Sequence, residues 1–144
     1  DKVDRIPITH PSMTRFWITL EQGINMVLST FDLMKGGEIF VPKIPSMKVV
    51  DLANAIAPGI PHDIIGIRPG EKLHEVMVTS DDARMTIDMG DRYAILPVFR
   101  FWGGGDDVSK DARRVSEDFA YSSDTNDEWL DATSFKEMVA SAGV

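Results

Sequence analysis

Two arginines and one glutamate are the residues of this chain whose types and places are suited to binding phosphates and hydroxyl groups. Arg68 ends an apolar stretch and precedes a Pro-Gly turn, and Glu71 follows that turn, within the segment GIRPGEKLHE at 66–75. Arg15 lies among Phe16, Trp17 and Ile18, where a guanidinium needs a partner. Because a guanidinium presents a planar fork that matches phosphate oxygens, the two arginines are candidates for a diphosphate clamp. The spacing leaves the alternative open that each arginine pairs with one of the 23 acidic side chains.

Other chemistry finds little support in the residue types. His10, His62 and His74 have no metal-ligand spacing, and LHEVM at 73–77 lacks the second histidine of a zinc-protease helix, since position 78 is Val. No Ser-His-Asp arrangement can be recognised from sequence. GGGDD at 103–107 has glycines but continues into acidic residues, which repel phosphate. We therefore predict no metal site.

Composition narrows the class of protein. The 144 residues fit a single domain over 1–144, with 43% hydrophobic and 26% charged residues. A net charge of −8 argues against a nucleic-acid partner and against a membrane surface. There is no cysteine, no apolar run near the ~18 residues that span a bilayer, and no signal-peptide pattern. We expect a cytoplasmic protein.

The elements that must position these residues alternate between strand and helix over 14–78. MTRFWI at 13–18 predicts a strand, and an apolar stripe of period 3.6 predicts a helix over 18–34. EIFVPK at 38–43 and HDIIGI at 62–67 predict two further strands, with a helix between them that Ser46 caps. The alternation predicts a small mixed α/β domain whose neighbouring strands are parallel. Residues 1–13, which contain two prolines, are expected to form a polar entry segment rather than a core element.

The remainder of the chain predicts short strands and a C-terminal helix. Two strands are expected around Gly90-Asp91, as a hairpin. Residues 103–118, glycine-rich and then highly charged, predict a mobile surface loop. Ser134 and Glu137 fit a capping box for a last helix that ends near Gly143.

Three long segments carry a resemblance to a known family. PITHPSMTRFWITLEQGINMVL, GGEIFVPKIPSMKVVDLA and IIGIRPGEKLHEVM, in that order, closely resemble the C-terminal half of the inverting UDP-N-acetylglucosamine 4,6-dehydratases. These are polysaccharide-biosynthesis enzymes of the extended short-chain dehydrogenase/reductase superfamily, and they make precursors of pseudaminic acid and related sugars. FAYSSDTNDEWL at 119–130 is similar to the ending of that family, and the resemblance is weakest across 97–118.

The resemblance implies a set of substrate-binding residues. Arg15 and Arg68 match the two pyrophosphate contacts, and Glu71 matches the acidic residue that binds the ribose hydroxyls. VPKIPSM implies that Val41, Pro42 and Lys43 lie along the uracil. Met13 and Thr14 are expected to line the sugar end.

The resemblance also implies what this chain lacks. In the family, an N-terminal Rossmann domain holds NADP and supplies the catalytic Tyr-x-x-x-Lys pair, and neither Tyr93 nor Tyr121 has a lysine four residues later. We therefore expect no catalytic residue and no bound cofactor in this chain, which would be a bacterial UDP-sugar-binding domain that is inactive alone. The alternatives are the substrate domain of a related epimerase or retaining dehydratase, and a non-catalytic interaction module. Because the face that packs on a cofactor domain would be exposed, we expect a homo-oligomer.

Overall fold

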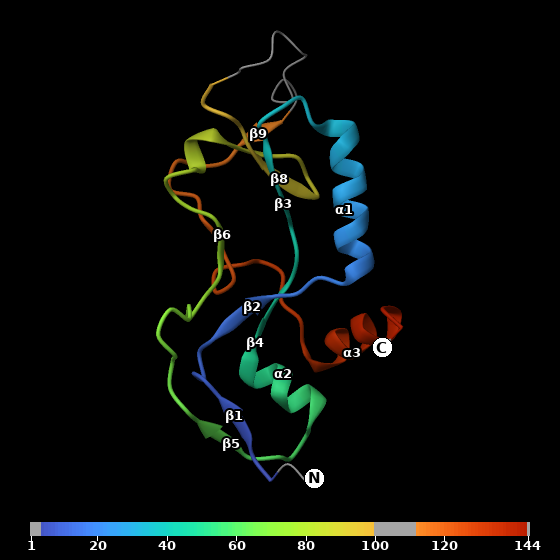
Figure 1. Ribbon diagram of the computed structural model, residues 1–144, viewed down its shortest axis with the longest axis vertical. Helices are drawn as coiled ribbons and strands as arrows, with labels where there is room; N and C mark the ends of the chain where they lie inside the picture. The colour runs from blue at the N-terminus through green and yellow to red at the C-terminus, as the bar shows by residue number, and fades with distance from the viewer. Residues whose placement is uncertain (1–3, 100–111, 144) are drawn as a thin grey trace. The chain divides into compact units, whose positions relative to one another are not determined.

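The computed structural model describes residues 4–99 and 112–143, and within them the chain divides into two compact units. Unit 1 comprises Asp1–Thr19, Ile44–Glu75 and Ser122–Val144, and unit 2 comprises Leu20–Lys43 and Val76–Tyr121. Figure 1 shows the elements in chain order. Each unit is built from segments that are distant in sequence, so contacts between distant residues hold each unit together internally.

Unit 1 contains two short strand pairs and two helices. Strand β1 (Ile6–Ile8) pairs in parallel with β5 (His62–Ile64), and β2 (Thr14–Phe16) pairs antiparallel with β4 (Ser46–Lys48). Helices α2 (Val49–Ile56) and α3 (Ala132–Ser141) contribute Ala55 and Phe135 to a core around the fully buried Met47. Trp17 packs edge-on against Phe135, with ring centroids 5.5 Å apart. This core fixes the segment from which Arg15 extends.

Unit 2 contains helix α1 (Leu20–Leu33) and an antiparallel sheet. The sheet order is β3-β8-β7-β9, formed by β3 (Ile39–Pro42), β8 (Arg92–Ile95), β7 (Thr86–Asp88) and β9 (Arg113–Arg114). A 3₁₀ turn, η1 (Ala83–Met85), precedes β7, and Ile87, Ala94 and Leu96 form the buried core. A further two-stranded sheet joins β6 (Val76–Val78) and β10 (Tyr121–Ser122).

The predicted fold class is confirmed, since the described residues form a mixed α/β structure. The helix expected over 18–34 is α1, and the strands expected over 13–18, 38–43 and 62–67 are β2, β3 and β5. The hairpin around Gly90-Asp91 is also confirmed, because β7 and β8 pair antiparallel on either side of it. The strongest periodic and turn signals were therefore reliable.

Three local predictions were wrong. Most pairings with a stated direction are antiparallel, and β2 pairs with β4 rather than with a parallel neighbour. Ser46 does not cap a helix: it lies in β4, and α2 begins at Val49 after Lys48. The last helix is capped by Asp131, whose carboxylate accepts a hydrogen bond from the Ser134 N–H at 2.8 Å.

Two segments expected to lack regular structure contain strands. Residues 1–13 include β1, in which Ile8 is buried, so the entry segment contributes to the core. Of the loop predicted over 103–118, residues 103–111 lie outside the described part of the chain. Residues 113–114 form β9, which pairs with β7 and extends the sheet of unit 2.

Helix α1 presents its apolar stripe to the surface of its unit. Leu20, Ile24, Val27, Phe31 and the adjacent Met34 are between 47% and 82% exposed. The opposite side contacts the sheet, where Arg92 donates to Ser29 Oγ at 2.9 Å. Among the described helices none is both long and apolar enough to cross a membrane.

Candidate functional site

The turn at Arg68–Glu71 has the geometry that its Pro-Gly pair predicts. The Glu71 N–H donates to the Arg68 carbonyl at 3.0 Å, and Gly70 takes a φ of +82°, which glycine adopts without strain. The Glu71 carboxylate closes the turn from the other side, because its Oε2 accepts from the Arg68 N–H at 3.2 Å. Its Oε1 accepts a longer bond, at 3.5 Å, from the Thr9 hydroxyl. The turn is therefore held by its own residues.

The guanidinium of Arg68 has no partner among the residues that the structure describes. Arg68 is exposed, and its side chain makes no hydrogen bond or ion pair with residues 4–99 or 112–143. A free guanidinium beside a carboxylate that retains acceptor capacity offers both a donor fork for an anion and an acceptor for hydroxyls. This pair is the chemically available part of the predicted site.

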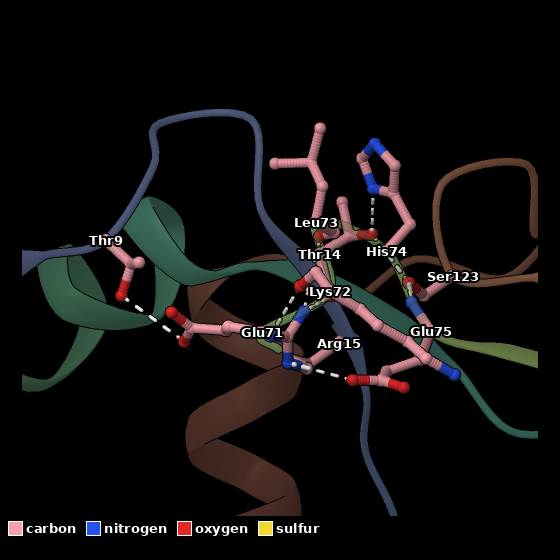
Figure 2. Close-up of polar contacts among 9 residues, drawn as sticks. All are labelled: Thr9, Thr14, Arg15, Glu71, Lys72, Leu73, His74, Glu75 and Ser123. Carbon is pink, nitrogen blue, oxygen red and sulfur yellow. Dashed lines mark hydrogen bonds and ion pairs between the residues drawn. The ribbon is translucent and has the colours of Figure 1, made fainter. Parts of the chain in front are cut away.

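Arg15, in contrast, is held by the segment that follows the turn (Figure 2). Its Nη1 donates to the carbonyls of Thr14 and Leu73 at 2.7 and 3.2 Å, and its Nη2 donates to the Lys72 carbonyl at 2.9 Å. Glu75 lies 3.6 Å from its Nε as an ion-pair partner. The acidic-partner alternative is thus met in part, and main-chain carbonyls provide the rest. Arg15 connects β2 to residues 72–75.

Met13 and Thr14 are buried, so neither side chain presents an open surface to a ligand in this structure. The Thr14 hydroxyl instead contacts two groups that sequence reasoning did not assign to the site. It lies 2.8 Å from His74 Nδ1 and 2.6 Å from Ser123 Oγ. His74 belongs to the segment GIRPGEKLHE, which the sequence singles out, whereas no sequence signal connects Ser123 with Thr14, 109 residues away.

The residues predicted to lie along the base belong to unit 2. Val41 is buried in β3 opposite Tyr93, and Lys43 Nζ lies 2.6 Å from Asp88 Oδ1 and 4.6 Å from the centroid of the Tyr93 ring. Burial acts to raise the pKa of Asp88, but the hydrogen bonds from Lys43 and from the Gly90 N–H outweigh it and lower that pKa. The Lys43 ammonium is therefore already paired. Pro42 is the last residue of β3.

The described residues contain no group of three or more His, Asp or Glu side chains placed to hold a metal ion. A pocket of about 590 Å³ lies in unit 1 at the starts of α2 and α3. It is lined by Lys48, Asp51, Asn54 and Trp129–Ala132, so none of the sequence-predicted site residues contributes to it.

Comparisons with known proteins agree with the motif positions. The chain is 50% identical over 139 residues to the inverting UDP-N-acetylglucosamine 4,6-dehydratase of Campylobacter jejuni subsp. jejuni serotype O:2, which covers 93% of this chain and 42% of the relative. The corresponding protein of serotype O:23/36 is 51% identical over 129 residues, covering 86% of this chain and 39% of the relative. The chain thus spans about two fifths of the length of these curated relatives.

Similarity is also found to a more distant relative, to a solved structure and to a family model. A UDP-glucose 4-epimerase of Rickettsia canadensis is 42% identical over 94 residues, covering 62% of this chain and 28% of the relative. The X-ray structure of Pen from Bacillus thuringiensis superposes with a TM-score of 0.75 at 24% identity, covering 96% of this chain and 40% of that one, and so shares the fold. The model of a family described as polysaccharide biosynthesis protein matches residues 1–97, which include the whole Arg68–Glu71 turn. The chain belongs to this polysaccharide biosynthesis protein family.

Proposed function

We propose that this chain binds a UDP-sugar and corresponds to the nucleotide-sugar-binding part of an inverting UDP-N-acetylglucosamine 4,6-dehydratase. The observation that carries the proposal is the exposed guanidinium of Arg68, which has no partner within residues 4–99 and 112–143, on a turn closed by Glu71. That turn lies inside the region matched by the family model, and the similar Campylobacter proteins are dehydratases of this sugar nucleotide.

We assign the roles from the hydrogen-bond donors and acceptors that each side chain does not use within the protein. Arg68 supplies the main fork to the pyrophosphate, and Arg15 adds only the donor capacity that its carbonyl partners leave. Glu71 accepts from ribose hydroxyls through its remaining lone pairs. Val41, Pro42 and Lys43 are proposed neighbours of the uracil through backbone and side-chain stem. Met13 and Thr14 are buried in this structure, and their place at the sugar end stays a prediction.

Titration calorimetry with UDP and with UDP-N-acetylglucosamine tests the binding. A charge-assisted bidentate contact contributes about 1.5–3 kcal/mol, so Arg68→Ala should weaken binding by roughly 10- to 100-fold. Arg84→Ala is the matched control, because it removes an exposed arginine from η1, in the other unit. Equal loss in both variants, or no binding of UDP by the unaltered chain, contradicts the proposal; absence of binding favours a non-catalytic module.

The complete reaction needs NADP, and the residues described here do not fit that cofactor. The three α-helices of the described residues begin after segments 17–19, 46–48 and 123–131, none of which contains a glycine for a dinucleotide turn. In the proposed full enzyme, NADP would supply the hydride-transfer chemistry, and residues outside those described would have to hold it. We propose that this polypeptide alone is inactive; formation of a 4-keto-6-deoxy sugar by it with NADP would overturn that.

A related epimerase is the second candidate, favoured by the similarity to the Rickettsia protein. The phosphate-binding turn suits either enzyme, since both act on UDP-linked sugars. Comparing the affinities for UDP-glucose and UDP-N-acetylglucosamine separates them. A preference for the acetamido sugar supports the dehydratase, and a preference for UDP-glucose supports the epimerase.

We propose, in addition, that the chain self-associates through α1. The exposed stripe of Leu20, Ile24, Val27 and Phe31 is a continuous apolar surface, and such surfaces generally become interfaces. A second copy of the same chain presents an identical stripe and can cover it symmetrically. Light scattering at high concentration should give a mass above 16.0 kDa, and a monomer would contradict self-association.

A further inference from the structure

A continuous chain of hydrogen bonds connects His74 and Glu75, which follow the proposed ligand-binding turn, to Thr14 of β2 and to Ser123 (Figure 2). The Glu75 N–H donates to Ser123 Oγ at 2.9 Å, Ser123 Oγ lies 2.6 Å from Thr14 Oγ1, and Thr14 Oγ1 lies 2.8 Å from His74 Nδ1. Ser123 is fully buried and Thr14 is 2% exposed, so water does not replace either partner. The imidazole is only partly buried, with its Nε2 3.9 Å from Asp124 Oδ2.

The direction of these bonds follows from counting donors and acceptors. Ser123 Oγ already accepts from the Glu75 N–H, and within the described residues the only acceptor near its own proton is Thr14 Oγ1. Ser123 therefore donates to Thr14, and Thr14 donates to His74 Nδ1. If Nδ1 carried a proton, Thr14 Oγ1 would have to accept from it. The proton of either the Thr14 or the Ser123 hydroxyl would then have no acceptor among the described residues, which is costly for a buried group.

We propose that His74, as the neutral tautomer with its proton on Nε2, is the residue that positions the 68–75 segment for ligand binding. Its Nδ1 is the terminal acceptor that gives the buried hydroxyl chain one direction. The same chain secures the Glu75 amide, and the Ser123 N–H in turn donates to the Glu75 carbonyl at 2.8 Å. His74 is a positioning residue, and its importance for ligand affinity rests on the UDP-sugar function proposed above.

Charged groups near the imidazole of His74 influence which of its two nitrogens carries the proton. Asp124, from the segment after β10, faces Nε2, and Glu75 and Lys72 flank His74 along its own segment. The Asp124 carboxylate is held by a hydrogen bond from the Ser122 hydroxyl. This bond lowers the pKa of Asp124 although burial opposes it. An ionised Asp124 attracts the Nε2 proton, which favours the same tautomer.

Nitrogen-15 NMR of the histidine side chains at a pH where the imidazoles are neutral tests the tautomer without any ligand. His74 should show an unprotonated Nδ1 and a protonated Nε2, and loss of its signals in His74→Asn assigns them. His10 and His62 provide internal references in the same spectrum. A protonated Nδ1 at His74 would overturn the proposal.

Two variants separate hydrogen bonding from packing at this position. His74→Asn places an amide oxygen near the former Nδ1 and keeps an acceptor for Thr14, whereas His74→Leu keeps more of the volume and removes the acceptor. The amide hydrogen exchange of Glu75 and Ser123 should rise by about tenfold or more in His74→Leu and by clearly less in His74→Asn. His10→Leu is the matched control and should leave both amides unchanged. The opposite order of the two His74 variants would show that the imidazole acts by packing and would refute the proposal.

UDP titration of the same variants connects the segment to binding. If the unaltered chain binds UDP, His74→Leu should lose several-fold more affinity than His74→Asn, and equal losses would contradict the positioning role. If the unaltered chain does not bind UDP, the proposed function fails, whereas the tautomer and the exchange results still decide whether His74 positions the segment.

Discussion

The two arginines of the candidate site differ in what holds their guanidinium groups, and this difference predicts that their substitution affects stability to different extents. Arg15 donates to three main-chain carbonyls, so Arg15→Ala leaves acceptors unpaired and should lower the free energy of unfolding by about 1–3 kcal/mol. Arg68 has no such partner in the described residues, and Arg68→Ala should change the free energy of unfolding by less than about 0.5 kcal/mol. Urea unfolding of both variants measures this. A similar loss of stability in both would show that the Arg68 guanidinium is paired within the chain.

A second residue-scale prediction concerns acid stability in unit 2. Arg92, which is buried, donates to both carboxylate oxygens of Asp91 at 3.0 and 2.7 Å, and these bonds lower the pKa of Asp91. A carboxylate with a lowered folded-state pKa stabilises the protein above its unfolded value of about 3.9, and this contribution is lost as pH falls through the folded-state pKa. Asp91→Asn should therefore be less stable than the unaltered chain at neutral pH and should lose less stability on acidification. Parallel unfolding free energies between about pH 6 and pH 3 would contradict the assignment.

At the scale of elements, two glycines that differ in backbone conformation predict changes of opposite sign. Gly70 has a φ of +82° in the turn, so Gly70→Ala should cost about 1–2 kcal/mol, although no atom lies within 4 Å of the added Cβ. Gly23 lies inside α1 with equal space around its Cβ, and Gly23→Ala should stabilise by about 0.5–1 kcal/mol. Thermal unfolding of the pair tests the argument, since steric crowding is absent at both positions. Destabilisation of equal size in both variants would refute it.

The elements also show which features could be predicted from the sequence. The 14 residues of α1 follow a sustained 3.6-residue period, and the Arg68–Glu71 turn follows from Pro-Gly chemistry, so both were predictable. Ser46 has the side chain of a helix cap, but its N–H donates to the Glu128 carbonyl and its hydroxyl accepts from Asn126. These tertiary bonds, 80 or more residues away, override the local preference.

In the candidate site, too, the local features were predictable from the sequence and the long-range contacts were not. Arg68 and Glu71 could be predicted because their geometry is set by four consecutive residues. The bonds from Arg15 to the Lys72 and Leu73 carbonyls could not, because these groups are 57 and 58 residues away and a carbonyl has no residue-type signature. The place of Thr14 against His74 and Ser123 likewise depends on long-range packing. The sequence therefore predicts the local chemistry of these residues, but it does not predict which distant group each side chain contacts.

At the scale of the whole molecule, each unit has a small buried core of its own, while the longest apolar stripe remains exposed on α1. A second copy of this chain is the proposed occupant of that stripe. Phe31 is 66% exposed near the C-terminal end of the stripe, so a second copy that pairs along α1 would cover it.

Phe31→Glu should therefore reduce self-association, because it places a charge in the proposed apolar interface without removing a buried contact. Asn25→Glu is the matched control: it adds the same charge to an exposed position of α1 outside the stripe and should leave the mass unchanged. Light scattering over a range of concentrations measures both, with circular dichroism to verify that each variant keeps its helices. If Phe31→Glu dissociates the oligomer by at least about tenfold in Kd while Asn25→Glu does not, α1 is the interface. Equal dissociation by both variants would attribute the effect to net charge, since the chain already carries −8, and an oligomer unaffected by Phe31→Glu would place the contact elsewhere.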